Sequence, residues 1–180
     1  SDSGLNVAFS PIDPIIAYRK FQINKDNYLF LGSDKKVKAD IDMLADDGTG
    51  AKIYSTPNEE ALQDITVSLL RLNLGELTSV IPYAPNITGF LNGDAHLIQT
   101  PTDLSVVIDM YANDMAYEKA PLGDISLNAV YLPNSDGTHF VDSRINHNEN
   151  EVLVLSGSYK QEDEDGIIDA GMELIDFPLS

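Results

Sequence analysis

The stretch Leu104-Ser105-Val106-Val107-Ile108-Asp109-Met110-Tyr111-Ala112-Asn113 decides the fold class of this chain. Its apolar side chains fall on alternate positions, at Leu104, Val106, Ile108, Met110 and Ala112, with Ser105, Asp109 and Asn113 between them. Because successive side chains of a β-strand point to opposite faces, this alternation is typical of a strand with one apolar and one solvated face. It predicts a strand of about nine residues, roughly 30 Å long.

The same alternation recurs through the second half of the chain. Its apolar positions are Leu91, Gly93, Ala95 and Leu97, then Ile125, Leu127, Ala129 and Tyr131, then Leu153, Leu155, Gly157 and Tyr159, and finally Ile168, Ala170, Met172 and Leu174. Turn-forming residues separate these runs at 100–103, 121–123, 133–137, 148–150 and 161–166. Strands joined consecutively by short turns form an antiparallel meander.

The first half is less regular but still strand-like. Strands are predicted at 15–23, 28–31, 37–43, 51–54 and 65–74, with a hairpin turn at 46–50. One short helix is expected near residues 75–81, ended by Pro82, since proline cannot continue a helix. No longer segment has a helical period, so the sequence predicts an all-β protein.

Composition excludes several function classes. The chain has 180 residues, 43% of them hydrophobic, a formal net charge of −18 and no cysteine. This hydrophobicity is too high for a disordered acidic tail, and the negative charge argues against binding to nucleic acid phosphates. Without cysteine there is no disulfide, thiol nucleophile or thiolate metal site. No apolar run approaches the roughly 20 residues that span a bilayer. The ends of the sequence suggest a fragment of a longer protein.

Catalytic and metal-binding patterns are weak. His96, His139 and His147 lack the spacing of a zinc site, and we expect solvated histidines. Acidic clusters at Asp42, Asp46 and Asp47 and at 162–165 do not follow a calcium-binding loop, and are expected to be solvated turns. No nucleophile elbow or phosphate-binding glycine loop is present. The sequence predicts neither an enzyme nor a resident cofactor or metal.

Several segments carry a resemblance to a known family. Ile87, Gly89, Leu91, Gly93 and Leu97 fit the pattern I-x-G-x-L-x-G-x-x-x-L, and the segments 67–77, 122–127, 155–159 and 177–179 fit neighbouring motifs in the same order. Over about residues 62–179, the chain resembles the TamB family of the translocation and assembly module, within the AsmA-like group. Its richness in Asn, Asp, Lys and Tyr resembles a Bacteroidetes-type member.

The resemblance implies an elongated antiparallel sheet curled into a U-shaped trough, a β-taco, with an apolar interior. Residues 1–61 would be a strand-rich N-terminal part and 62–180 the TamB-like unit of one continuous domain. It further implies a Gram-negative periplasmic protein with an inner-membrane anchor outside this fragment and an Omp85-type, TamA-like outer-membrane barrel as partner. The expected roles are phospholipid transfer between the membranes, outer-membrane protein assembly and secretion.

An apolar sheet face needs a cover, which can be a second sheet, barrel closure or an apolar ligand. In the trough interpretation the ligand is a phospholipid acyl chain or a nascent outer-membrane protein strand. The residues predicted to line the groove are Leu91, Ala95, Leu97, Leu104, Val106, Ile108, Met110, Ile125, Leu127, Leu153, Leu155, Ile168, Met172 and Leu174.

Three alternatives stay open from the sequence. The same residues form a ligand-free core if the sheet closes into a sandwich. A secreted or surface β-sandwich that binds carbohydrate or protein predicts an exposed aromatic platform, which the eight tyrosines leave possible although tryptophan is absent. An acidic, calcium-stabilised β domain predicts a melting temperature that rises with added calcium.

Overall fold

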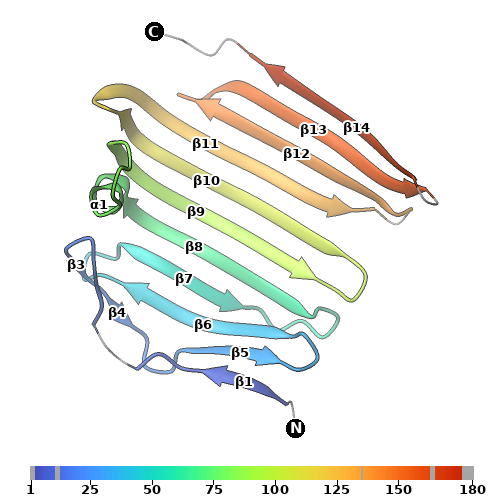
Figure 1. Ribbon diagram of the computed structural model, residues 1–180, viewed down its shortest axis with the longest axis horizontal. Coiled ribbons are helices and arrows are strands. Elements are labelled where there is room, and N and C mark those ends of the chain that lie inside the picture. Colours follow the sequence, from blue (N-terminus) through green and yellow to red (C-terminus); the bar gives the residue numbers. More distant parts are fainter. Residues whose placement is uncertain (1–2, 11–12, 135, 163–164, 176–180) are drawn as a thin grey trace.

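The chain forms one broad antiparallel sheet in this computed structural model, which describes residues 3–10, 13–134, 136–162 and 165–175 (Figure 1). The elements are β1 (Gly4–Val7), β2 (Ile15–Ile16), β3 (Arg19–Lys20), β4 (Gln22–Ile23), β5 (Tyr28–Gly32), β6 (Val37–Leu44), β7 (Gly50–Ser55), β8 (Gln63–Asn73), α1 (Leu74–Ser79), β9 (Ile87–Gln99), β10 (Leu104–Tyr117), β11 (Ala120–Pro133), β12 (Thr138–His147), β13 (Asn150–Glu162) and β14 (Asp165–Leu174). The predicted all-β antiparallel meander with one short helix is confirmed.

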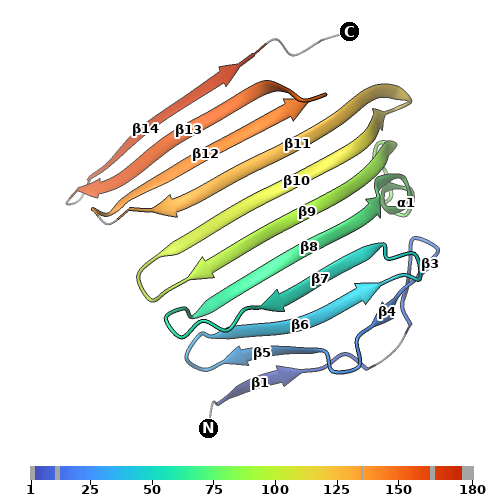
Figure 2. The same cartoon turned by 180° about the vertical axis from the view of Figure 1, so that it is seen from behind.

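The strands follow one another across the sheet almost in chain order. The twelve-stranded sheet has the order β1-β5-β6-β7-β8-β9-β10-β11-β12-β13-β14, and β4 pairs with one end of β6. β1 and β14 therefore form its two outer edges, as Figures 1 and 2 show from opposite sides. Strand pairing from β5 to β14 joins sequence neighbours through short connections, apart from the segment containing α1 between β8 and β9.

One predicted strand is wrong. Instead of a continuous strand at 15–23, the chain makes the small hairpin β2–β3 and then the separate strand β4. Ala17 and Tyr18 have φ angles of 49° and 64°, which give the tight reversal between β2 and β3. Alternation of apolar residues did not reveal this reversal because neither residue is a usual turn former.

The helix α1 begins and ends for local reasons. The Asn73 side chain accepts a hydrogen bond from the Glu76 backbone N–H at 3.2 Å, which caps the first turn. The helix ends at Ser79, three residues before Pro82, so it is shorter than the predicted segment. α1 packs on β8 and β9 at the same end of the strands as the β2–β3 hairpin (Figure 2).

The sheet has a thin core. Among the described residues, the buried apolar side chains are Phe21, Ala39, Ala61, Ala112 and Val152, and no large side chain is fully enclosed. Apart from the main sheet, the described residues form one other sheet, the two-stranded β2–β3 pair. The main sheet therefore neither closes into a barrel nor packs against a second sheet, and the closed sandwich of the sequence alternatives is not observed. No helix within the described ranges is long and apolar enough to cross a membrane.

Candidate functional site

One face of the sheet, which we call the apolar face, carries a mostly apolar set of alternate residues on each strand from β6 to β14. The opposite face mixes charged residues with exposed apolar ones such as Val107, Leu132 and Phe140. Residues directly opposite each other in an antiparallel pair share a face, so the strand register defines it. Its central row runs through Ile41, Ile53, Val67, Ala95, Ile108, Ala129, Ser143, Leu155 and Met172. Because neighbouring strands lie about 4.8 Å apart, this row from β6 to β14 is roughly 40 Å long.

All residues predicted to line the groove lie on this apolar face. Ala95, Ile108 and Leu155 belong to the central row, and the others join it through the pairs Leu91–Ala112, Leu97–Val106, Met110–Leu127, Leu153–Leu174 and Tyr159–Ile168 and through alternation along each strand. Most are half-buried by neighbours in the same sheet, whereas Ile168 and Met172 on the edge strand are 74% and 73% exposed. The structure thus brings the predicted residues together on one open surface.

The predicted set stopped short of the first half of the sheet. Ile41 and Met43 on β6 and Ile53 on β7 extend the apolar face, and Phe9 and Ile23 border a cavity of about 230 Å³ beside them. The sequence of β6 does alternate between apolar and charged residues, which indicates an apolar face. The apolar positions are Val37, Ala39, Ile41 and Met43, and Lys38, Asp40 and Asp42 lie between them. Shorter strands and fewer repeats made it less conspicuous.

Charge is partitioned between the two faces. At the register-paired positions of the apolar face from β6 to β14, the described part of the chain has no Asp, Glu, Lys or Arg. On the opposite face, which we call the polar face, the row beside the central one contains Asp42, Lys52, Ser68, Asp94, Asp109, Asn128 and Arg144. Lys52 Nζ pairs with Asp42 Oδ2 at 3.0 Å, and Asn128 donates to Asp109 Oδ1 at 2.9 Å. A chain with a formal net charge of −18 therefore has no acidic or basic side chain at these paired positions of the apolar face.

Among the residues whose burial the structure describes, the polar face has one well-buried carboxylate. Asp64, only 8% exposed, bonds His96 Nε2 at 2.7 Å and accepts from Asn58 Nδ2 at 3.0 Å. Burial alone raises the pKa of Asp64, but the hydrogen bonds from His96 and Asn58 outweigh it and lower the pKa below its usual value. His96 is therefore held in a pair with a carboxylate and is not simply a solvated histidine.

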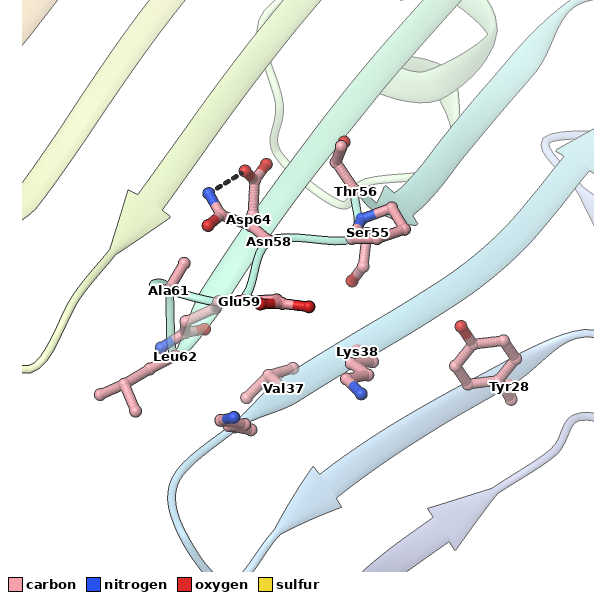
Figure 3. Close-up of a pocket in the computed structure, with 13 residues that line it drawn as sticks. Tyr28, Val37, Lys38, Ser55, Thr56, Asn58, Glu59, Ala61, Leu62 and Asp64 are labelled. Atoms are coloured by element: carbon pink, nitrogen blue, oxygen red, sulfur yellow. Dashed lines mark hydrogen bonds between the residues drawn. The ribbon is translucent and has the colours of Figure 1, made fainter. Parts of the chain in front are cut away.

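A cavity of about 410 Å³ lies beside this carboxylate, where the short β7 ends and leaves space between β6 and β8 (Figure 3). Its wall has the cations Lys36 and Lys38 on one side and Glu59 and Asp64 on the other. These charged side chains are not arranged as a nucleophile with a base or as a pair of facing carboxylates, so the cavity does not resemble a catalytic site.

The described residues contain no group of His, Asp and Glu side chains placed to hold a metal ion. Asp42 pairs with Lys52, and Asp47 pairs with Arg19, so these acids are partly neutralised by cations. Of the second acidic cluster, residues 163 and 164 lie outside the described residues, as does the motif at 177–179.

Comparisons with protein-family models, with curated proteins and with solved structures gave no match to this chain.

Proposed function

We propose that this chain is a non-enzymatic, lipid-binding part of a TamB-like envelope protein, whose apolar face binds acyl chains of phospholipids. The uncharged apolar face, continuous across the sheet and left open by the described chain, is the observation that carries this proposal. Burying each methylene on such a surface stabilises the complex by about 0.8 kcal/mol, so a whole acyl chain supplies enough free energy for binding.

The arrangement also suits movement of a lipid along the protein. The apolar face offers aliphatic side chains on most strands, and the one polar residue of its central row, Ser143 on β12, is uncharged. An acyl chain can therefore shift across the sheet without passing a charged side chain. This is the property that phospholipid transfer between an inner and an outer membrane requires. We accordingly propose a periplasmic setting, a membrane anchor outside this sequence and an outer-membrane barrel of the Omp85 type as partner.

A second candidate cargo is a nascent outer-membrane protein strand. Within the described residues β14 pairs only with β13, so its other edge has free backbone donors and acceptors. An extended peptide can add to such an edge by backbone hydrogen bonds. The apolar face favours lipid as the main cargo, because strand addition alone does not need a surface that is uncharged on every strand.

The test compares two aspartate substitutions on adjacent residues of β10. Ile108→Asp places a charge in the centre of the apolar face, whereas Val107→Asp places one on the polar face, where Val107 is already 42% exposed. Native mass spectrometry and lipid extraction of detergent-free protein measure bound phospholipid, and circular dichroism checks the fold. We expect lipid in the parent protein and in Val107→Asp, and little in Ile108→Asp.

Two results would contradict the proposal. One is a parent protein without bound lipid that also takes up none from phosphatidylglycerol vesicles. The other is equal lipid binding by the two folded variants.

A further inference from the structure

A depression in the apolar face lies above Gly157, in the middle of β13. Val141 on β12 and Ala170 on β14 are directly opposite Gly157, and Leu155 and Tyr159 flank it along its own strand. Because glycine has no side chain, its larger neighbours border an open depression of about 310 Å³. Asp169 and the two serines beside Gly157 lie on the polar face, so the side chains that border the cavity on the apolar face are uncharged.

Aromatic side chains with polar atoms border one end of this cavity. The Tyr131 hydroxyl and His139 Nδ1 are 2.9 Å apart, and their rings stack with centroids 5.7 Å apart. The Tyr159 ring follows at 6.3 Å from His139, on the next strand. These residues lie close to the turn that joins β11 to β12, whereas Leu155 and Leu153 continue the apolar floor in the other direction along β13. The site is therefore apolar along its length and polar at one end.

From this geometry we infer that the depression over Gly157 is a binding subsite for a single acyl chain, whose carboxyl or ester end lies at Tyr131, His139 and Tyr159. This inference rests on the proposed function and gives the apolar face a defined ligand position. The chemistry of the lining matches such an amphiphile, since a tyrosine offers an apolar ring to the chain and a polar hydroxyl to the carboxyl or ester group.

The dimensions fit one acyl chain. Along β13 the cavity is lined from Leu155 to Tyr159, four residues further on, which corresponds to roughly 13 Å. A bilayer core of about 30 Å holds two acyl chains end to end, so one chain extends about 15 Å. The cavity is at the small end of ligand sites, which favours one chain over the paired chains of an intact phospholipid lying side by side.

Two glycines allow a matched test. Gly157→Val fills the depression, and a Cβ at this position would lie 3.2 Å from the Asp169 carbonyl oxygen, so only a small shift is needed. Gly171→Val adds the same side chain to the adjacent strand on the polar face, where a Cβ would contact only Ser156 Oγ at 3.7 Å. Ala170→Leu fills the depression from the exposed edge strand and serves as a second variant if Gly157→Val does not fold.

Two probes are used. Binding of palmitic acid is measured by native mass spectrometry and calorimetry, and uptake of phospholipid from phosphatidylglycerol vesicles is measured by extracting the protein-bound lipid. We expect the parent protein to bind one palmitate per chain. Gly157→Val and Ala170→Leu should bind palmitate about tenfold more weakly, which corresponds to about two methylenes losing burial. Gly171→Val should bind palmitate as tightly as the parent. The same pattern with phospholipid alone supports the subsite and identifies the esterified chain as its source.

Other outcomes overturn the inference in distinguishable ways. If the filled variants bind as tightly as the parent while Ile108→Asp loses lipid, the subsite is wrong and the proposed function stands. If the parent binds neither probe, both fail.

Discussion

Arg19 and Glu76, far apart in sequence, form a two-pronged ion pair that joins the β2–β3 hairpin to the helix α1. Arg19 Nε donates to Glu76 Oε2 at 3.0 Å and Arg19 Nη2 to Glu76 Oε1 at 2.9 Å, and Arg19 Nη1 also pairs with Asp47 in the β6–β7 turn. The planar guanidinium suits this double contact, which a lysine cannot reproduce. One side chain thus holds three peripheral segments at the same end of the sheet.

Replacing Arg19 should loosen this end of the molecule without unfolding the sheet. We expect Arg19→Gln to raise amide hydrogen exchange several-fold in the β2–β3 hairpin and in α1, with little change in β9 to β13. Lys20→Gln is the matched control, because Lys20 is more exposed and forms its ion pair with Asp13 on its own side of the hairpin rather than with α1. Uniform loss of protection throughout the sheet would show that the contact supports the whole fold.

Acid should weaken the same cluster. The Thr49 backbone N–H and the Arg19 guanidinium lower the pKa of Asp47 from 3.8 to about 2, and Arg19 lowers the pKa of Glu76. A carboxyl group whose pKa is lower in the folded state stabilises the fold above its ordinary pKa, and this contribution is lost as the pH falls toward the lowered value. As the pH is lowered from about 4 to about 2, we expect the urea concentration at the unfolding midpoint to decrease. The decrease should be smaller in Asp47→Asn, which lacks one of the two carboxyl groups. Identical pH profiles would contradict this assignment.

The buried Asp64 should matter more than an exposed acid of the same face. Asp64→Ala leaves His96 and Asn58 without their shared acceptor, and we expect a loss of about 1–3 kcal/mol in the free energy of unfolding. Asp109→Ala removes an exposed carboxylate that bonds Asn128, and it should change stability by no more than about 0.5 kcal/mol. Urea denaturation of both variants measures the difference, and equal effects would refute the role of burial.

Gly93 is required by the backbone of β9. Its φ of 140° disfavours other residues, and a Cβ there would overlap the Asp109 carbonyl oxygen and Met110 Cα on β10. We expect Gly93→Ala to cost about 2–4 kcal/mol of unfolding free energy, whereas Gly171→Ala, whose Cβ would make only an ordinary contact with Ser156 Oγ, should be nearly neutral. A neutral Gly93→Ala in urea denaturation would mean that β9 and β10 adjust their spacing.

Added salt should stabilise the protein. Because the formal net charge is −18, repulsion among carboxylates outweighs the few surface ion pairs. Raising sodium chloride from about 0.05 M to about 0.5 M shortens the range of this repulsion, so the thermal unfolding midpoint should rise. Sodium sulfate and sodium chloride at equal ionic strength separate charge screening from general salting-out. A midpoint that falls with both salts would show that specific ion pairs dominate.

The sequence by itself determined the strands and the content of the two faces. Alternation such as that of Val106, Ile108 and Met110 with Val107 and Asp109 depends only on strand geometry, so it predicted the long strands and one apolar face. Turn residues at 100–103 and 148–150 predicted the meander. The chain reversal at Ala17 and Tyr18 was not predicted, because neither alanine nor tyrosine indicates the positive φ angles that the turn requires.

Only the tertiary structure decided that the apolar face stays open and where its features lie. Whether a second layer covers a sheet depends on contacts between distant segments, which periodicity does not contain. Register across several strands aligns Val141, Gly157 and Ala170 and so creates the depression, although these residues come from three different strands. In the same way, Arg19 meets Glu76 only because the hairpin and the helix lie at one end of the sheet.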